Sequence, residues 1–432
     1  MAAKPLDAVI VGAGHRSVLY ASYAEKAPED LRIVAVVDPW DERRERAGDR
    51  FNVPRGRRFR SVEELLEQPR LGQAAINGTM DPLHVETTLP LLDAGYDVLL
   101  EKPIAPEAEG TMRIANAARA AGRTVIVCHV LRYAPFYREL RQRIVDGVVG
   151  DIVNIQTAEH VSYHHLAVAF LRGKWSNRQQ CGSSMLLAKC CHDLDLVAWM
   201  KSGVRPVRVS SFGGTYQFRP DKAPEGAGMR CLVDCPLEAD CVYSARKHYI
   251  DNTWWPYYAW ECLEHLENPT IEDKIESLKT DNPFGRCVWH CDNDVVDHQS
   301  VAVEFEDGST ATHNLVGASS RPLRSIHIVG TEGELCGCLE DSRFSIYRPD
   351  LDPKKEFSEE VVDVSIPDSA KGEDGHGGGD LRLVEDFVNV LRGQPASIST
   401  TTIDDSINGH LVVYCADQAM SEGRVVEIPS MR

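Results

Sequence analysis

A charged triplet at the end of an apolar run is the first feature of this sequence that points to chemistry. In DVLLEKPIAP (97–106), the apolar residues 98–100 lead directly into Glu101, Lys102 and Pro103. Charges at the tip of a buried strand are costly unless the strand ends in a cleft where they are used. We therefore expect Lys102 to face a ligand and to polarise a hydroxyl there. The alternative is a solvated lysine at a strand end.

A second group of ionisable residues lies in GSSMLLAKCCHDLDLVAWM (182–200). The spacing predicts a helix over 186–200, and Lys189, His192 and Asp193 fall on one of its faces. That face is expected to point into the core, so three ionisable groups on it need a reason. His192 is the one base among them that titrates near neutral pH. We predict that it transfers a proton, the alternative being a hydrogen-bonded core histidine.

A glycine-rich loop follows the first predicted strand, 6–11. The loop GAGHRS (12–17) leads into a predicted helix, 18–26. Gly12 and Gly14 supply the tight turn and the bare backbone that let a pyrophosphate sit at a helix N-terminus. The third position of this fingerprint is Ser17, where Gly or Ala is usual. The pattern predicts a dinucleotide site, the alternative being a glycine turn without a ligand.

An acidic residue ends the second predicted strand, 32–37. Asp38 lies 21 residues beyond Ser17, close to the spacing at which an acid binds a ribose 2′-hydroxyl. A carboxylate there repels a 2′-phosphate, so NAD is favoured over NADP. Arg43 and Arg44 lie one helical turn further on and keep NADP open as the less favoured cofactor.

Strands and helices alternate through the first 130 residues, which predicts a doubly wound parallel α/β sheet. Ligands of such sheets bind at the carboxyl ends of the strands. Residues 77–79, 101–103 and 128–129 all fall at such ends. Further strands are expected over 73–78, 98–100 and 124–129, and helices over 63–67, 83–94, 107–121 and 129–146.

Composition limits the classes of function. The chain has 432 residues, 43% of them apolar, and a formal net charge of −18. That charge argues against nucleic acid and against an anionic membrane as the main partner. No apolar run is long enough to span a membrane, and the first residues enter a strand without a signal-peptide pattern, so we expect a cytoplasmic protein. The 13 cysteines are expected to be thiols or ligands, not a disulfide framework.

Three motifs resemble one known family. GAGHR (12–16), TMDPLH (79–84) and AGYDVLLEKP (94–103) are similar to those of the Gfo/Idh/MocA oxidoreductases, which include glucose–fructose oxidoreductase and inositol dehydrogenase. The resemblance spans the whole chain, because IHIVGTEGEL (326–335) matches a later family turn. It implies an NAD-binding Rossmann domain over 1–130. It also implies an α+β domain over 131–432 with an open, mostly antiparallel sheet.

The resemblance carries further expectations about this second domain. One face of its sheet pairs with a neighbouring subunit, so we expect a homodimer or homotetramer. Residues 212–300 look like an insertion relative to shorter relatives, and helices within 380–420 are expected to pack back toward the Rossmann domain.

The resemblance also assigns roles to residues. Lys102 of the family's Glu-Lys-Pro motif contacts both substrate and cofactor, and His192 acts as general acid/base on the hydroxyl being oxidised. The family carries an Asp four residues before this His, where the present chain has Ala188, and we expect Lys189 or Asp193 to take over its contacts. The expected cofactor-binding residues are Gly12, Gly14, His15, Arg16, Ser17, Asp38, Thr79, Glu101 and Lys102.

Four other residues are candidates for substrate contact. Asp193 is one, the alternative being a helix ion pair with Lys189. His165 and Trp175 lie in SYHHLAVAFLRGKW (162–175), where aromatic and polar groups together suit a sugar ring, the alternative being a sheet-edge loop. His376 precedes three glycines, near the point where related proteins often place a His in the substrate cleft.

The predicted insertion contains cysteine and aromatic residues for which the sequence leaves more than one role open. Cys231, Cys235 and Cys241 do not have a standard zinc spacing, and Cys262, Cys287 or Cys291 would have to complete a site. We assign no metal and leave that question open. The aromatic run NTWWPYYAW (252–260) covers the cleft, packs on a partner subunit, or fills the insertion's own core, and the last is expected.

Three functions remain open at this point. The leading one is an NAD-dependent oxidoreductase acting on a secondary hydroxyl of a sugar, polyol or glycoside. The second is redox-neutral glycoside cleavage or epimerisation through a transient keto-sugar with bound NAD. The third is a non-enzymatic NAD-binding regulator, which the presence of both Lys102 and His192 argues against.

Overall fold

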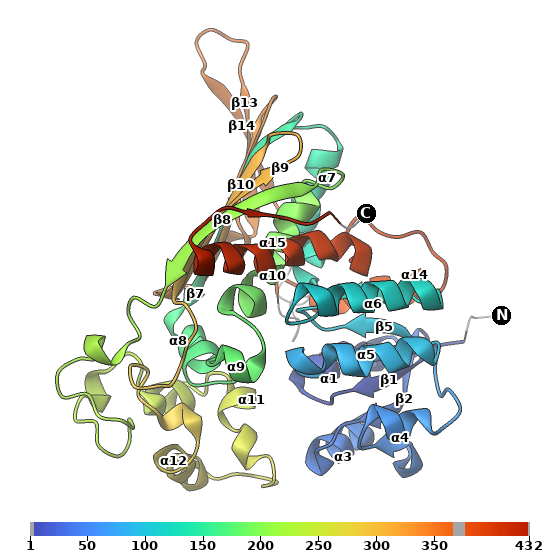
Figure 1. The fold of residues 1–432 in the computed structure, drawn as a ribbon, viewed down its shortest axis with the longest axis vertical. Coiled ribbons are helices and arrows are strands. Elements are labelled where there is room, and N and C mark those ends of the chain that lie inside the picture. Colours follow the sequence, from blue (N-terminus) through green and yellow to red (C-terminus); the bar gives the residue numbers. More distant parts are fainter. Residues whose placement is uncertain (1–3, 366–375, 431–432) are drawn as a thin grey trace.

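The computed structural model describes residues 4–365 and 376–430. Its first sheet has six parallel strands in the order β3-β2-β1-β4-β5-β6, which confirms the predicted doubly wound arrangement (Figure 1). These strands are β1 (Leu6–Val11), β2 (Leu31–Val37), β3 (Arg58–Phe59), β4 (Ala74–Asn77), β5 (Asp97–Leu100) and β6 (Val125–Val127). The two-residue strand β3 is too short for its sequence pattern to predict.

The strands of this sheet are nearly continuous apolar runs because helices cover both faces. Alternate residues of a strand point to opposite faces. Ile10, Ile76 and Leu99 pack with Tyr20 of α1 and Phe387 of α14. The other face packs against α5 and α6. The helices of this part are α1 (His15–Ala21), α2 (Tyr23–Lys26), α3 (Asp41–Arg50), α4 (Val62–Leu66), α5 (His84–Asp93) and α6 (Ala108–Ala121), joined by α14 (Asp380–Leu391) from far along the chain.

The second sheet has nine strands in the order β14-β13-β12-β11-β7-β10-β9-β8-β15. All neighbours are antiparallel except β7 and β10, so the prediction of a mostly antiparallel sheet is confirmed. The strands are β7 (Ile152–Ser162), β8 (Pro206–Gly214), β9 (His298–Phe305), β10 (Thr310–Ser319), β11 (Leu323–Gly330), β12 (Glu334–Cys338), β13 (Arg343–Pro349), β14 (Phe357–Asp363) and β15 (Val426–Glu427).

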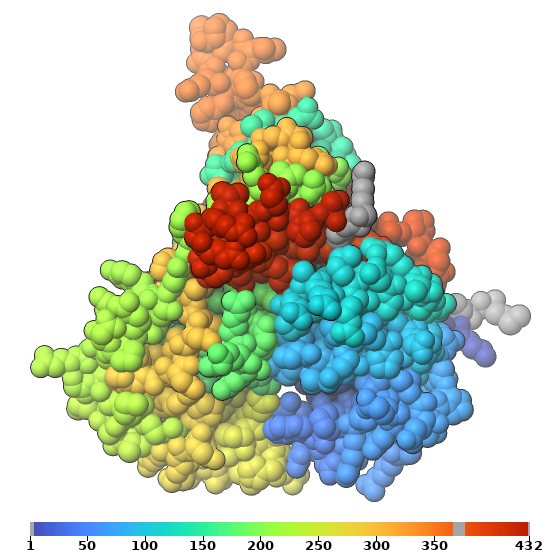
Figure 2. Space-filling model, viewed as in Figure 1, coloured from blue at the N-terminus to red at the C-terminus, as the bar shows by residue number. Residues whose placement is uncertain are grey.

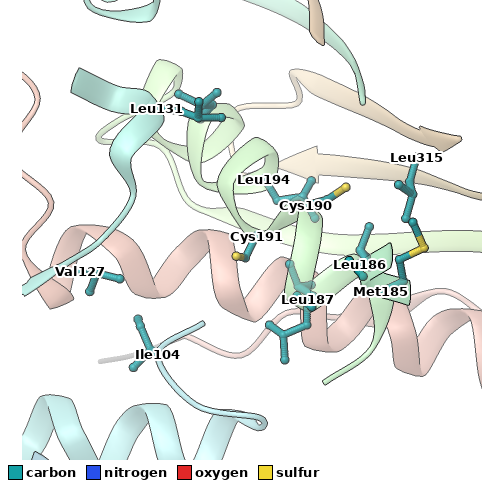
Figure 3. Close-up of a cluster of buried hydrophobic side chains, with 14 of the residues drawn as sticks. Ile104, Val127, Leu131, Met185, Leu186, Leu187, Cys190, Cys191, Leu194 and Leu315 are labelled. Atoms are coloured by element: carbon teal, nitrogen blue, oxygen red, sulfur yellow. The ribbon is translucent and has the colours of Figure 1, made fainter. Parts of the chain in front are cut away.

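Two long helices lie against this sheet, α10 (Met185–Met200) and α15 (Ile403–Glu422), and they also reach the Rossmann side (Figure 1). Of the 16 residues of α10, 14 are buried. Its apolar side chains, among them Leu187, Cys191 and Leu194, point away from the helix in several directions (Figure 3). A helix buried all round must give each of its polar side chains a partner or a function.

The helix predicted over 129–146 is two elements. A 3₁₀ turn covers Val130–Tyr133, and α7 begins anew at Pro135 and runs to Val145. Proline at the first helical position lacks the N–H that a continuing helix would need, so it separates the two. Among the described residues, no helix combines the length and the apolar character needed to cross a membrane.

The predicted insertion lies between β8 and β9, over 215–297. It contains short helices, among them α11 (Pro256–Ala259) and α12 (Ile271–Lys279). It reaches the Rossmann side at α3, where Arg43 pairs with Glu261 and, at 2.8 Å, with Glu264. Figure 2 shows the yellow part of this insertion beside the blue N-terminal residues, with a narrow opening between them. Two other short helices, α8 (Tyr163–Leu166) and α9 (Arg178–Cys181), precede α10.

Candidate active site

Lys102 and His192 are brought together by the end of β5 and the middle of α10. The chain turns after Glu101 through a cis Lys102–Pro103 bond. Lys102 Nζ then donates a hydrogen bond to the carbonyl oxygen of Ala188 at 2.9 Å. Ala188 lies one helical turn before His192. The backbone of α10 thus holds the ammonium next to the imidazole, at the carboxyl edge of the parallel sheet.

His192 is placed as a neutral base. It is 5% exposed, and its Nδ1 has no hydrogen-bond partner among the described residues. Burial lowers its pKa well below the ordinary imidazole value, and the nearby positive charge of Lys102 lowers it further. The ring is therefore uncharged at neutral pH and able to accept a proton.

A second buried histidine, His129, follows β6 and lies beside His192. The two rings are 5.6 Å apart in an edge-on contact, and His410 lies 5.2 Å beyond His129. Asp195 lies 3.7 Å from His129 Nε2 and forms a bidentate pair with Arg132, at 2.7 and 2.5 Å. The sequence patterns did not single out Asp195 or Arg132. Their common signal is a charged residue inside an otherwise apolar stretch.

Glu101 begins a polar network that joins three distant segments. Its carboxylate accepts hydrogen bonds from Arg16 Nε and from the Tyr20 hydroxyl, both at 2.9 Å. Burial disfavours the charged form of Glu101, but Arg16 and Lys102 outweigh it and lower its pKa. Arg16 also pairs with Asp380 at 2.5 Å. The network therefore ties the glycine loop to the Glu-Lys-Pro turn and to α14.

His376 joins this network through Asp380. Its Nδ1 lies 3.2 Å from the Asp380 carboxylate, and its ring is 5.8 Å from that of His192. The structure thus brings His376 to the site, as expected. Asp380 is the first residue of α14, and Gly379 is the N-cap of this helix. The Asp380 carboxylate serves the pairs with Arg16 and His376.

The structure overturns one alternative for the other polar residues of α10, the ion pair between Asp193 and Lys189. Asp193 accepts a hydrogen bond from Arg324 Nε at 3.0 Å, and Lys189 pairs with Glu159 at 3.0 Å. Arg324 also contacts Glu159 at 2.6 Å. Asp193 and Lys189 therefore take partners from the second sheet, not each other. Lys102 has the Ala188 carbonyl as its partner, and the takeover of the family Asp's contacts by Lys189 or Asp193 stays a prediction.

The glycine loop has the shape that a dinucleotide needs. Gly12 has φ +78°, and a Cβ there would lie 3.0 Å from Gly78 O and from the Thr79 nitrogen. A Cβ at Gly14 would meet no atom within 4 Å, so the space beside its backbone is open to a ligand. Ser17 is fully buried, and a Cβ on Gly78 would collide with its hydroxyl. Ser17 thus packs closely against Gly78, the residue after β4. Close packing of the helix on the sheet is the role of the third glycine in the fingerprint.

Asp38 lies at the end of β2 beside this loop. Its carboxylate accepts the backbone N–H groups of Ala13 at 2.7 Å and Trp40 at 2.8 Å. The two arginines that kept NADP open are both engaged elsewhere. Arg43 pairs with Glu261 and Glu264 of the insertion, and Arg44 with Asp41 and the Asp38 carbonyl. These residues fit NAD, because Asp38 lies at the end of β2 beside the glycine loop and neither arginine of this pair is left unpaired for a 2′-phosphate.

The insertion covers the cofactor loop with an aromatic ring. Tyr257 stacks on His15, with centroids 4.1 Å apart and planes 10° apart. The expectation that residues 252–260 fill the insertion's own core holds for Trp260, which contacts Tyr249. It is wrong for Tyr257, and it is also wrong for Trp255, which stacks on His165 at 4.5 Å.

Trp175 lies at the same boundary. Its Nε1 donates to Asp81 Oδ2 at 3.3 Å, and its ring meets Tyr258 edge-on at 5.9 Å. The structure therefore places His165 and Trp175 in one aromatic group with Trp255 and Tyr258 of the insertion. His165 and Trp175 come before α10 in the chain. Thr79 is held at the glycine loop through hydrogen bonds to Asn77.

Two family models match this chain. One, described as an oxidoreductase family with an NAD-binding Rossmann fold, matches residues 6–129. The other, described as the C-terminal alpha/beta domain of the same oxidoreductase family, matches residues 141–428. The fold and the site define a nicotinamide-dependent dehydrogenase acting on CH–OH groups. The chain belongs to the Gfo/Idh/MocA family of oxidoreductases, and its cofactor is NAD.

Known relatives differ in what their names say. A putative oxidoreductase, YteT, of Bacillus subtilis is 25% identical over 320 residues, 71% of this chain and 70% of that protein. An inositol 2-dehydrogenase of Leifsonia xyli is 26% identical over 51% of this chain and 60% of that protein. A levoglucosan dehydrogenase solved with NADH and levoglucosan has a TM-score of 0.70 at 15% identity, with 99% of this chain and all of that one covered. The last similarity shows the fold.

Proposed function

We propose that this protein oxidises a secondary hydroxyl of a sugar, polyol or glycoside. The observation that carries the proposal is the junction of Lys102 and α10, which sets a cation and a neutral imidazole side by side. Relatives named for inositol and levoglucosan support a substrate rich in hydroxyl groups. When bound, NAD supplies the hydride acceptor.

In this proposal the two residues have separate roles. The Lys102 ammonium donates a hydrogen bond to the substrate oxygen and stabilises negative charge as it develops there. The neutral imidazole of His192 accepts the hydroxyl proton. The ion pairs of Arg16 with Glu101 and Asp380 fix the glycine loop relative to the Lys102 turn. The cofactor would then approach the carbon whose hydroxyl contacts the base.

The substrate would lie between the aromatic group and His376. Flat apolar rings suit the faces of a sugar, and polar edges suit its hydroxyls. Trp175, Trp255 and His165 supply the rings, and His376, held by Asp380, supplies a polar edge 5.8 Å from His192. Asp193 is less suited than the others because Arg324 already pairs with it.

A redox-neutral reaction is the second candidate, and one observation favours it. Tyr257 lies on His15, and Arg43 is tied to Glu261, so the insertion closes over the cofactor loop. A cofactor enclosed in this way suits an enzyme that returns the hydride to its product. Transient oxidation would then acidify a neighbouring carbon and allow cleavage or epimerisation.

One incubation distinguishes these reactions. The purified protein and NAD meet a mixture of polyols, free sugars and glycosides, while mass spectrometry follows the products and absorbance follows NADH. A product lighter by two hydrogens, matched by NADH, is the expected result. Loss of a whole sugar unit, or an isomer of unchanged mass, without NADH would replace net oxidation by the redox-neutral reaction. NAD bound without any turnover would favour the regulator.

A further inference from the structure

Four cysteines of the insertion surround one cavity that the proposed reaction does not use. The cavity has a volume of about 340 Å³, and Cys231, Cys235, Cys241 and Cys287 all line it. All four are free thiols. The sequence left three candidates for a fourth member of this set, and the cavity selects Cys287 among them. Cys262 is exposed, and Cys291 does not line the cavity.

The four thiols line the same cavity but are not gathered at a point. Among the described residues, the group of three ligand atoms that lie within 4.8 Å of one another is at Cys190, not here.

This spacing bears on the size of the group that would fit. Tetrahedral zinc with Zn–S bonds near 2.3 Å draws its sulfurs to within about 3.8 Å of one another. An iron–sulfur cluster with four irons keeps its four thiolates further apart, each on a different iron. Four sulfurs spread around a cavity match the larger group.

A buried arginine on the cavity wall supplies the charge that such a group needs. Arg172 is 1% exposed, and its Nη2 lies 3.5 Å from Cys231 Sγ. Its other hydrogen bonds go to the Tyr243 and Arg286 carbonyls and to the Tyr249 hydroxyl. No carboxylate in the described part of the chain forms an ion pair with it. A buried cation without an anion is costly, and thiolates bound to a cluster carry net negative charge.

The carboxylates near the cavity do not fill this role. Glu238 and Asp240 also line it, but Asp240 is exposed and Glu238 accepts a hydrogen bond from the Ser244 hydroxyl. The remaining lining is largely apolar, including Leu237, Val288 and Trp289. Sulfur ligands in an apolar wall suit a soft metal centre better than an oxygen-binding cation.

We propose that Cys231, Cys235, Cys241 and Cys287 bind a 4Fe–4S cluster in this cavity. Assembly takes up two ferrous ions, two ferric ions and four sulfides, and it releases the four thiol protons, so no further oxidant or reductant is needed. The cluster acts as a staple for the insertion. Arg172 and Tyr249 connect it to the loop before α10, and the same insertion carries Tyr257 to His15. This role does not depend on which hydroxyl the enzyme oxidises.

The test begins with the wild-type chain, purified without oxygen. Iron, zinc and acid-labile sulfide are measured per chain, together with the visible absorption of sulfur-to-iron charge transfer. About four irons and four sulfides per chain, after purification or after reconstitution with sulfide and equal amounts of ferrous and ferric iron, are expected. One zinc per chain without sulfide would overturn the cluster, and so would a chain that takes up no metal under either condition.

Variants then locate the ligands. Cys231→Ser and Cys287→Ser should lose most of the iron and sulfide, whereas Cys262→Ser, an exposed cysteine of the same insertion, should retain them. Because a ligand variant can misfold, the cluster is also removed from the wild-type chain with a chelator. The insertion over 215–297 should then become several-fold more sensitive to protease, and reconstitution should restore resistance. Iron and sulfide unchanged in both ligand variants would contradict the assignment.

Discussion

At the residue scale, the proposed reaction divides the handling of one hydroxyl between a fixed cation and a neutral base. Lys102 is fixed by the Ala188 carbonyl, and His192 is kept neutral by burial. A protonated imidazole at this place would face Lys102 and would lose its capacity to accept a proton. The pairing therefore explains why the charged turn and the buried helix meet.

Replacement of Lys102 tests its role directly. Lys102→Met should fold and bind NAD but lose turnover by about 100-fold or more, because a positioned proton-transfer or charge-stabilising group contributes 10²–10⁴-fold. The measurements are kcat, NAD affinity and the unfolding midpoint. Lys279→Met, at an exposed lysine of α12, is the matched control and should leave kcat unchanged. Retained activity in Lys102→Met would remove this residue from the mechanism.

The pH dependence tests His192. The base acts only when neutral, and its pKa in the folded protein lies below the ordinary value near 6.5. Oxidation should therefore persist below pH 6.5 and fall only as the pH passes through the lowered value. The measurement is kcat/KM against pH, with His192→Asn losing both the rate and this acid limb. A wild-type limb centred at or above 6.5 would contradict the neutral environment of His192.

The sequence identified Lys102 and His192 because each lies in a local pattern, a strand end and a helix face. It did not identify their partners. Arg324 donates a hydrogen bond to Asp193, which lies 131 residues earlier in the chain. Asp195 lies beside His129, more than 60 residues away in the chain. Such pairs follow from how the two sheets meet, and no spacing within one segment encodes them.

At the element scale, the insertion is the part whose position the sequence did not predict. Its aromatic run was expected to pack inward, yet Tyr257 lies on the cofactor loop. The strands of the parallel sheet, in contrast, were predicted from runs of apolar residues that both faces bury, and the open antiparallel sheet was expected from the family resemblance. Where an irregular segment packs depends on tertiary contacts, here Arg43 with Glu261 and Trp255 with His165, that leave no periodic signal.

Removal of the stacked ring tests the insertion as a cover. Tyr257→Ala should weaken NAD binding by about 2- to 10-fold, because an aromatic pair contributes about 0.5–1.5 kcal/mol beyond its buried area. Most of the change should appear in the dissociation rate of NAD, measured by stopped-flow fluorescence. Tyr216→Ala, at an exposed tyrosine of the same insertion, is the control. An unchanged dissociation rate would mean that the insertion does not cover the bound cofactor.

At the scale of the whole molecule, buried histidines make the fold sensitive to acid. Burial lowers the pKa of His129, His165, His192 and His410, the last to about 3. Above pH 6.5 both folded and unfolded chains hold these groups neutral, so they do not affect stability. Below 6.5 the unfolded chain binds protons that the folded chain excludes, and the free energy of unfolding must fall.

Urea unfolding at pH 7.5 and at pH 5.5 measures this loss. Each group whose folded pKa lies well below 5.5 contributes up to about 1.4 kcal/mol per pH unit below 6.5. We expect the unfolding midpoint to be clearly lower at pH 5.5, and His410→Asn to reduce the difference between the two values. A midpoint that is equal or higher at pH 5.5 would contradict the burial of these rings in the neutral form.

The nine-stranded sheet leads to the last prediction, because helices cover only one of its faces. Val301, Leu315 and Ile328 point to α10 and α15, while Phe212, Ser300 and Asn314 lie in register on the opposite face. On that face Phe212 is 76% exposed, and Val316 and Val361 are exposed as well. A wide sheet face of small polar residues with exposed apolar ones is suited to a partner of the same kind.

We therefore expect a homodimer or homotetramer, measured by size-exclusion chromatography with light scattering at micromolar concentration. The double variant Phe212→Asp and Val316→Asp should dissociate, because a symmetric interface brings each new charge close to its own copy. Ile271→Asp, at an exposed residue of α12, should remain assembled. If the wild-type chain is a monomer, or if the double variant keeps its assembly, then the open sheet face is not the interface. In that case, repulsion between chains that each carry a net charge of −18 explains why molecules with such a surface do not associate in solution.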